Sequence, residues 1–473
     1  MSLYKGPGRP GTPGQPAGNR QGGQQRRGHD RAGGNRPASA HLDVPGTELR
    51  VLAAGVLQEV CANGRSLKAV LAPAQQQLDD SRDRALLEAI CLAALRQRGR
   101  YRRALNGWMP RPLGARDADL EALLLAGFAQ LDALKLADHA AVSATVQAAH
   151  RMGRSHQAGM VNALLRRVQR EGIAPASPIN AFPHWLADAI AADWPRLSDS
   201  IFAASLEEPP LWLRVHAGKS TAADYLTRLQ QAGVVAELAP ELANAIYLPA
   251  AVPVAQLPGF ADGLVSVQDG SAQQLADLLA DLPAGSRVLD ACAAPGGKAA
   301  HLLERQPQLQ VLAMDIDERR ARRMGETFAR TGVQAQVLAA DASAPATWWD
   351  GQLFDAIVLD APCSATGIIR RQPDVLLHRR EQDIAALIQL QARLLDAVWT
   401  MLRPGGRLVY ATCSILRAEN TDQVSAFLQR TADAALVDPG DAFGHACAAG
   451  RQWLPGEDGR DGFFYAVMNR ISQ

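Results

Sequence analysis

The 473-residue sequence lacks several features that would place it in a common class of protein. It has only six cysteines and no CxxC pair, so we expect neither a disulfide framework nor a metal site. It has no apolar run long enough to cross a bilayer, and its start, MSLYKGPGRP, lacks the apolar core of a secretory signal. These absences favour a soluble protein of the reducing cytoplasm that has no membrane partner.

The small net charge of +1 conceals a basic, Gly/Pro-rich tail at residues 1–44. Its first 40 residues carry Lys5 and six arginines against Asp30 alone, and almost nothing apolar. Such a segment cannot bury enough surface to offset the cost of ordering its backbone, so we predict that it is disordered. Two interpretations stay open at this point: a solvated extension, or an arm that binds RNA without sequence preference.

Residues 45–172 are predicted to form an all-α bundle of five or more helices. Apolar residues recur at helical spacing throughout, beginning with Val51, Leu52, Val56 and Leu57 after Thr47, the expected N-cap. Two basic clusters, RQRGRYRR (96–103) and LLRRVQR (164–170), fit either a solvated helix face or an RNA contact.

Residues 173–270 are predicted to form a small α/β linker domain. The proline-containing stretch EGIAPASPINAF (171–182) separates it from the bundle. A short helix, PHWLADAIAADW, precedes a strand at 211–215, a helix from about Thr221 and a second strand at Val234.

Residues 271–473 alternate strands with helices, which predicts a parallel sheet covered on both faces. Expected strands are RVLDA (287–291), QVLAMD (310–315), AQVLAAD (335–341), DAIVLDAP (355–362), RLVYATC (407–413) and FFYAVMN (463–469). Ligands of such sheets bind at the carboxyl ends of the strands. Asp315, Asp341, Asp360 and Cys413 lie at those ends, so we expect them at one edge of one sheet.

A small-residue loop, LDACAAPGGKAAHLLE (289–304), joins the first of these strands to a helix. Gly296 and Gly297 let the backbone approach a ligand, and the helix start offers free N–H groups. The loop has neither the GxGxxG spacing of a dinucleotide site nor the GxxxxGK[ST] spacing of a phosphate loop. Together with Asp315 and Asp341 after the next two strands, it predicts a site for a nucleoside cofactor.

Cys363 and Cys413 each follow a predicted strand and each precede a serine. A single buried cysteine is more often a small apolar residue than a reactive one. Two cysteines, each at a strand end and each beside a predicted cofactor cleft, favour reactive thiols. Arg370 and Arg371 follow Cys363 and are natural contacts for RNA phosphates.

The motifs DACAAPGGK, DAPCSATG and YATCS, in this order, resemble those of RNA cytosine-C5 methyltransferases that use S-adenosylmethionine. LPGFADGLVSVQDGSAQ (257–273) and LPGEDGRDGFFYA (454–466) are similar to the flanking segments of that family, and RDRALLEAICLAALR with MVNALLRRV is similar to a NusB-like RNA-binding domain. The resemblance covers about residues 45–473. It implies a multidomain chain with a NusB-like bundle, a small linker domain and a Rossmann-like methyltransferase domain.

The resemblance also implies the reaction, which is methyl transfer to C5 of a cytosine in 16S rRNA through a covalent bond between a cysteine and C6. It assigns the attack to Cys413, product release to Cys363 and a hydrogen bond with the base to Asp360, with Lys298 beside Asp360. The cofactor would be held by Asp315, Asp341, Asp360 and a loop that consists of Cys292, Ala293, Ala294, Pro295, Gly296, Gly297 and Lys298. Arg214, in LWLRVHAGK, is a further expected RNA contact.

Two other functions stay open. A tRNA cytosine-C5 methyltransferase would share the chemistry, and a noncatalytic RNA-binding ribosome assembly factor would share the fold. A scaffold would have no need for both thiols and Asp360, which favours the enzyme, and the helical domain favours rRNA by resemblance. No coiled-coil heptads are present, so we expect a monomer.

Overall fold

The computed structural model describes residues 44–471, which form one compact unit. The predicted basic tail, with any RNA-binding arm in it, lies outside the described residues except for Val44. The predicted domain boundaries at residues 172 and 270 stay predictions. None of the described helices combines the length and apolar character needed to span a bilayer.

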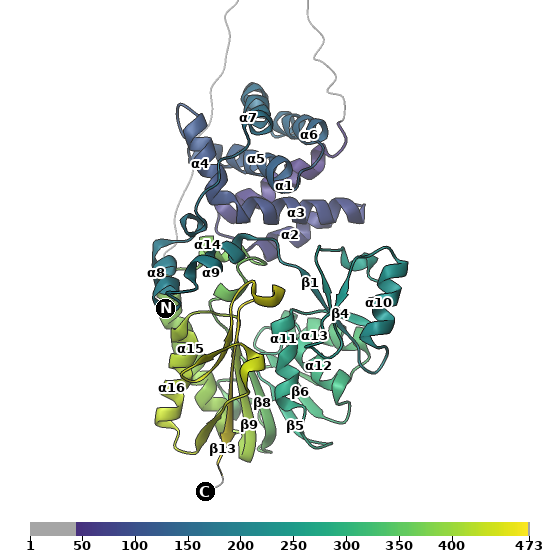
Figure 1. Cartoon of the computed structure of the whole chain (residues 1–473), viewed down its shortest axis with the longest axis vertical. Coiled ribbons are helices and arrows are strands. Elements are labelled where there is room, and N and C mark those ends of the chain that lie inside the picture. Colours follow the sequence, from purple (N-terminus) through teal and green to yellow (C-terminus); the bar gives the residue numbers. More distant parts are fainter. Residues whose placement is uncertain (1–43, 472–473) are drawn as a thin grey trace, which may run out of the picture. The chain divides into compact units, whose positions relative to one another are not determined.

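The part from Thr47 to Glu171 is helical, as the apolar spacing predicts (Figure 1). The apolar stripe of α5, with Leu120, Leu123 and Phe128 fully buried, lies in a core shared with the helices around it. The bounds are α1 (Thr47–Cys61), α2 (Leu67–Gln75), α3 (Ser81–Arg96), α4 (Arg98–Trp108), α5 (Ala118–Phe128), α6 (Asp138–Arg151) and α7 (Ala158–Glu171).

The predicted N-cap at Thr47 is wrong by one residue. Gly46 occupies that position with a left-handed φ of 78°, and the Thr47 hydroxyl donates to the Val44 carbonyl instead of capping the helix. A glycine suits this backbone conformation because it has no Cβ.

The next part carries two helices, α8 (His184–Asp193) and α9 (Ser198–Leu206), and then a four-stranded antiparallel sheet in the order β2-β3-β1-β4. Its elements are β1 (Leu211–Val215), α10 (Ala222–Gln231), β2 (Glu237–Leu238), β3 (Ala245–Leu248) and β4 (Val265–Val267). The strand predicted at Val234 is wrong, because Gly233 turns the chain with φ 72° and the strand begins only at Glu237.

A nine-stranded sheet forms the last part, and its parallel half runs in the order β9-β8-β5-β6-β7. Those strands are β5 (Arg287–Asp290), β6 (Gln310–Asp315), β7 (Gln336–Ala339), β8 (Phe354–Asp360) and β9 (Leu402–Thr412). The other edge consists of β10 (Ala434–Val437), β11 (His445–Cys447), β12 (Gly450–Trp453) and β13 (Phe463–Arg470). The expectation of an all-parallel sheet is therefore wrong at β13, which pairs antiparallel with β9.

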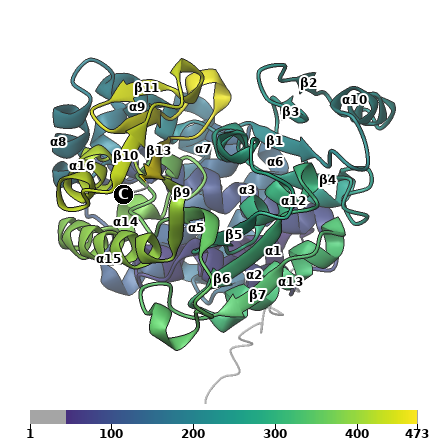
Figure 2. The ribbon, with the colours of Figure 1, turned by 90° about the horizontal axis from the view of Figure 1, so that it is seen from below.

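Helices cover both faces of this sheet (Figure 2). On one face α12 (Gly297–Arg305) and α13 (Glu318–Thr331) pack through Ala300, Met324 and Phe328. On the other, α15 (Glu381–Thr400) and α16 (Thr421–Arg430) pack through Leu395 and Phe427. The buried parallel strands consequently read as continuous apolar runs, and their carboxyl ends are the edge left for polar groups.

Candidate active site

The two cysteines that follow neighbouring strands meet at the carboxyl edge of the sheet. Asp360 at the end of β8 pairs in register with Ala411 of β9, so the chain segments that follow lie side by side. The sulfurs of Cys363 and Cys413 are 3.4 Å apart, and both side chains are partly exposed. Sequence order alone separates them by 50 residues, and strand pairing brings them together.

The surroundings of Cys363 shift the pKa of its thiol. The hydrogen bond with Cys413 and burial raise the pKa of Cys363 well above its ordinary value. Cys363 is therefore a protonated thiol at neutral pH, able to donate to the sulfur of Cys413.

A buried polar network that the sequence analysis missed ties the two cysteine loops together beneath the sulfurs. Glu419 is fully buried and accepts hydrogen bonds from the Ser364 amide at 2.8 Å and the Ser414 hydroxyl at 2.6 Å. The hydroxyls of Ser364, Ser414 and Thr366 lie 3.1 Å from one another, and Gln391 donates to Glu419 at 3.1 Å. The only sequence signal for this network was the serine that follows each cysteine.

Lys298 and Asp360 form an ion pair next to the thiols. Lys298 is the second residue of α12, and its ammonium lies 2.5 Å from the Asp360 carboxylate and 5.2 Å from the centre of the Phe463 ring. Burial works to lower the pKa of Lys298, but the attraction of Asp360 outweighs it and raises the pKa. Lys298 is therefore held in its charged ammonium form beside Asp360.

A second carboxyl nearby, Asp290 at the end of β5, is fully buried. Its oxygens have no hydrogen-bond partner among the described residues, and burial raises its pKa to about 7.

A cavity of about 260 Å³ extends from the thiols along the ends of the strands. Asp315, at the end of β6, and Asp341, after β7, also line this cavity. Leu390 and Leu394 of α15 add apolar surface to it. Asp315 is 3% exposed; its carboxylate accepts from the Asp317 amide and lies 3.2 Å from Arg320. A carboxylate can accept hydrogen bonds from the two hydroxyls of a ribose, and an apolar wall can pack against an adenine ring. The cavity therefore has the groups that a nucleoside cofactor needs.

The expected cofactor loop divides into two sets. Cys292 and Ala294 line the cavity, whereas the other residues of the loop do not: Ala293, Pro295, Gly296, Gly297 and Lys298. Gly296 has φ 94°, and a Cβ there would lie 3.1 Å from the Phe328 ring, so this turn requires glycine. Burial raises the pKa of Cys292, which keeps its thiol unreactive. No group of three or more His, Cys, Asp or Glu side chains in residues 44–471 is arranged to hold a metal ion.

The arginines expected to contact RNA need correction. Arg214 is 1% exposed and forms a buried ion pair with Glu304 at 2.7 Å, which joins β1 to α12. Arg370 is buried against Asp461 at 2.6 Å. Neither guanidinium has surface left for a phosphate, so both fit a structural role.

Arg371 is 27% exposed in its side chain but forms ion pairs with both Asp269 and Asp461. Its charge is thus already balanced by two carboxylates within the fold, and less of its side chain is exposed than the predicted RNA contact would need.

Known proteins match every part of this architecture. The family described as 16S rRNA methyltransferase RsmB/F matches residues 278–469, its ferredoxin-like domain matches 182–255, and the NusB family matches 47–170. A "Ribosomal RNA small subunit methyltransferase B" of Xanthomonas campestris is 57% identical over 436 residues, which cover 92% of this chain and 100% of that protein. This degree of identity over the whole length decides the family.

The chain belongs to the 16S rRNA methyltransferase RsmB/F family. The RsmB/F match agrees with the fold expected from the sequence, which is confirmed: a NusB-like helical bundle, a small linker domain and a C-terminal methyltransferase domain dependent on S-adenosylmethionine.

Solved structures support the same fold. The crystal structure of PH0851 superposes with a TM-score of 0.75 at 21% identity and covers 91% of this chain and 100% of its own. A methyltransferase homolog from Pyrococcus horikoshii superposes with a TM-score of 0.54 at 26% identity, covering 63% of this chain and 100% of its own. Both likenesses concern the fold.

Proposed function

We propose that this RsmB/F family member transfers the methyl group of S-adenosylmethionine to C5 of a cytosine in 16S rRNA. The observation that carries the proposal is a pair of thiols 3.4 Å apart in the lining of a cavity that Asp315 and Asp341 also line. The 57% identity to a small-subunit rRNA methyltransferase supports the choice of RNA. A noncatalytic assembly factor would need neither thiol.

The cofactor residues follow from the cavity. Asp315 would accept hydrogen bonds from the ribose hydroxyls, Asp341 would lie on the adenine side, and Cys292 with Ala294 would pass close to the methionine part. The bound cofactor supplies the methyl group. Because Cys363, Cys413 and the acidic pair line one continuous space, the donor and the thiols would share it.

The protein's part in the chemistry begins with the target base, which must leave its stack to reach the edge of the sheet. Cys413 attacks C6 of the cytosine as a thiolate, which places electron density on C5 and makes that carbon able to accept the methyl group. Loss of the C5 proton and cleavage of the C6–sulfur bond restore the aromatic ring and free Cys413. One difficult step is thereby divided into two easier ones.

The neighbouring groups have separate tasks in this scheme. Asp360, held by Lys298 at 2.5 Å, hydrogen-bonds the cytosine near N3 and its amino group. Its carboxyl group gives N3 a proton as the sulfur adds to C6 and takes that proton back when the C6–sulfur bond breaks, so that negative charge does not build up on the ring. Cys363, whose high pKa keeps it protonated, acts in the release of the product from Cys413.

Trapping the covalent intermediate tests this assignment. Purified variants are incubated with S-adenosylmethionine and unmethylated 16S rRNA, denatured, and examined for protein that stays attached to RNA. We expect Cys363→Ala to accumulate the adduct and Cys413→Ala to form none and to lose methylation. Cys61→Ala, in α1, is the matched control and should behave as the wild type.

Two results would count against the scheme. An adduct in Cys413→Ala but not in Cys363→Ala would reverse the roles of the thiols. Methylation that survives in Cys413→Ala would exclude this thiol as the attacking group.

A further inference from the structure

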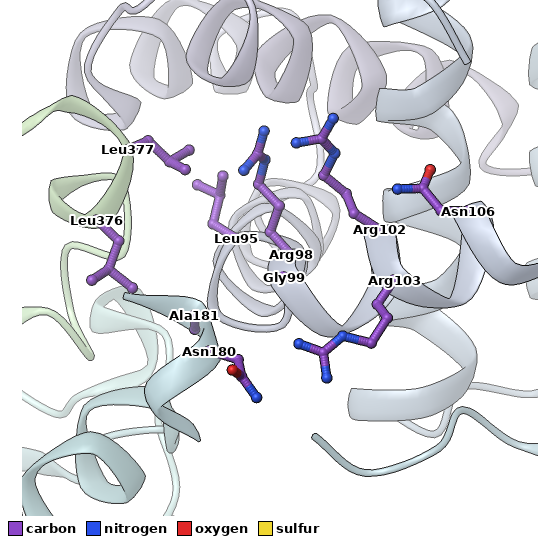
Figure 3. Close-up of a pocket in the computed structure, with 10 residues that line it drawn as sticks. All are labelled: Leu95, Arg98, Gly99, Arg102, Arg103, Asn106, Asn180, Ala181, Leu376 and Leu377. Atoms are coloured by element: carbon purple, nitrogen blue, oxygen red, sulfur yellow. The ribbon is translucent and has the colours of Figure 1, made fainter. Parts of the chain in front are cut away.

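A cavity of about 460 Å³ lies away from the thiols, where α4 meets the 3₁₀ helix η4 (Pro178–Ala181) and the short helix α14 (Val375–His378) (Figure 3). Three arginines of α4 line it; Arg98 and Arg102 project in one direction and Arg103 toward the side of Asn180. Leu376 and Leu377 add an apolar wall. The cavity thus combines positive charge with an apolar surface.

The charge in this cavity is unbalanced. No aspartate or glutamate lines it, and neither Arg98 nor Arg103 forms an ion pair with a carboxylate within residues 44–471. The Nε of Arg98 is buried and has no hydrogen-bond partner there. Arg102 binds Glu121 through its own Nε at 2.8 Å, which leaves the outer nitrogens of its guanidinium available.

The other arginines of the basic cluster at 96–103 have structural partners. Arg96 is 8% exposed and donates to the Arg370 carbonyl at 2.7 Å, and Arg100 binds Asp132 through two nitrogens. Within this cluster, Arg96 and Arg100 are bound to other parts of the fold, whereas Arg103 lines the cavity and has no ion pair among the described residues.

The cavity continues past Arg103. A second hollow of about 230 Å³ shares Gly99, Arg103, Asn180 and Ala181 with the first, so these residues lie between two adjoining spaces. Arg96, Arg100 and one carboxylate, Glu207, also line this second hollow. A ligand that follows both spaces would be longer than a single anion.

The cavity is also connected to the active site. Leu376 and Leu377 belong to α14, and the residue that follows this helix, Arg379, donates to the carbonyls of Ser364 and Cys363 at 3.2 and 3.4 Å. One helical turn thus separates the wall of the cavity from the backbone that carries Cys363.

We propose that this cavity binds a nucleotide of single-stranded rRNA other than the methylated one, an inference that rests on the proposed function for the identity of the RNA. Arg98 and Arg102, which project in one direction, hold the phosphate on one side of this nucleotide, and Arg103, which projects the other way, holds the phosphate on its other side. Guanidinium groups suit this role because they match phosphate oxygens in pairs. The sugar and base lie against Leu376 and Leu377. The volume lies within the range of small-ligand sites and exceeds what a bare phosphate needs.

The test uses Arg103→Gln, because Arg103 is exposed and its loss leaves no buried group unpaired. Arg228→Gln is the matched control: Arg228 is an exposed arginine of α10 with no ion pair among the described residues. Binding of a labelled 12-nucleotide single-stranded RNA is measured by fluorescence anisotropy at several salt concentrations. Methylation of unmethylated 16S rRNA is measured in parallel.

We expect Arg103→Gln to weaken RNA binding about tenfold, the effect of one charge-assisted hydrogen bond. Log affinity should depend less steeply on log salt concentration: the magnitude of the negative slope should decrease by about 0.7, the value for one phosphate on a single strand. The KM for 16S rRNA should rise in proportion, and Arg228→Gln should change none of these quantities. Arg103→Glu should weaken binding further.

The remaining outcomes distinguish a failure of the cavity proposal from a failure of the proposed function. Equal losses in Arg103→Gln and Arg228→Gln, or no loss in either while the wild type methylates 16S rRNA, would overturn the cavity proposal alone. A loss of binding confined to Arg103 variants, with no methylation by the wild type, would overturn the proposed function alone. Uridine monophosphate that binds as tightly as the 12-nucleotide RNA would show a mononucleotide site in place of an RNA site.

Discussion

Glu419→Gln tests whether the buried network beneath the thiols sets their positions. The Glu419 carboxylate is fully buried and accepts three hydrogen bonds, one each from Ser364, Gln391 and Ser414. Glutamine has nearly the same shape, but its NH₂ replaces one acceptor oxygen and the negative charge is lost. At least one of the three donors then loses its acceptor.

The magnitude follows from what the substitution removes. A hydrogen bond to a charged group contributes about 1.5–3 kcal/mol, so the free energy of unfolding should fall by about 2 kcal/mol. The substitution should most affect the 2.6 Å hydrogen bond from the Ser414 hydroxyl to Oε2 of Glu419. Ser414 directly follows Cys413, so a change in this bond would shift the thiol. A displacement of about 1 Å in a reacting group costs on the order of 100-fold in rate, so kcat should fall about that much.

Urea unfolding gives the change in stability, and steady-state methylation of 16S rRNA at a temperature where the variant is fully folded gives kcat. Glu59→Gln, which removes an exposed ion pair with Arg65 on the helical part, is the control and should leave both quantities near the wild-type values. Wild-type stability together with wild-type kcat in Glu419→Gln would refute the positioning role. Lowered stability with unchanged kcat would leave Glu419 a purely structural residue.

Three further predictions concern the charges around the site. Lys298→Met should lower kcat about 100-fold or more, measured by methyl transfer, because Asp360 loses the cation 2.5 Å away that orients it. Burial raises the pKa of Asp290 from its ordinary 3.8 to about 7, so its contribution to stability is full below pH 3.8 and is lost as the pH rises through about 7. In Asp290→Asn the free energy of unfolding, measured in urea, should therefore change less with pH between these two values than it does in the wild type. Glu304→Gln should cost about 3–5 kcal/mol in the same assay, because it leaves Arg214 buried without its carboxylate; a cost below 1 kcal/mol would argue against a buried pair.

The strands and the edge that carries the site could be predicted because the relevant information is local. Each parallel strand reads as an apolar run that stops at a polar residue, and buried parallel strands must bring their ends together at one edge. Asp315, Asp360 and Cys413 therefore lie where the sequence analysis expects them. The helical part could be predicted for the same reason, since its apolar spacing follows the period of a helix.

Other features depend on partners that are distant in the sequence. Arg214 and Arg370 look like surface arginines, but their carboxylate partners Glu304 and Asp461 lie 90 and 91 residues away. The antiparallel direction of β13 depends on how the chain returns to β9 and leaves no mark in the apolar pattern of FFYAVMN. Glu419 was missed because an isolated glutamate in a polar stretch resembles a solvated one until the fold buries it.

Mapping of 5-methylcytosine in 16S rRNA tests the proposed function most directly. The rRNA of cells that lack this protein is compared by bisulfite sequencing with that of cells carrying the wild-type chain or its Cys413→Ala variant. The proposed chemistry predicts one cytosine of 16S rRNA that is methylated with the wild-type chain and unmethylated in the other two. An identical methylation pattern in all three would contradict it.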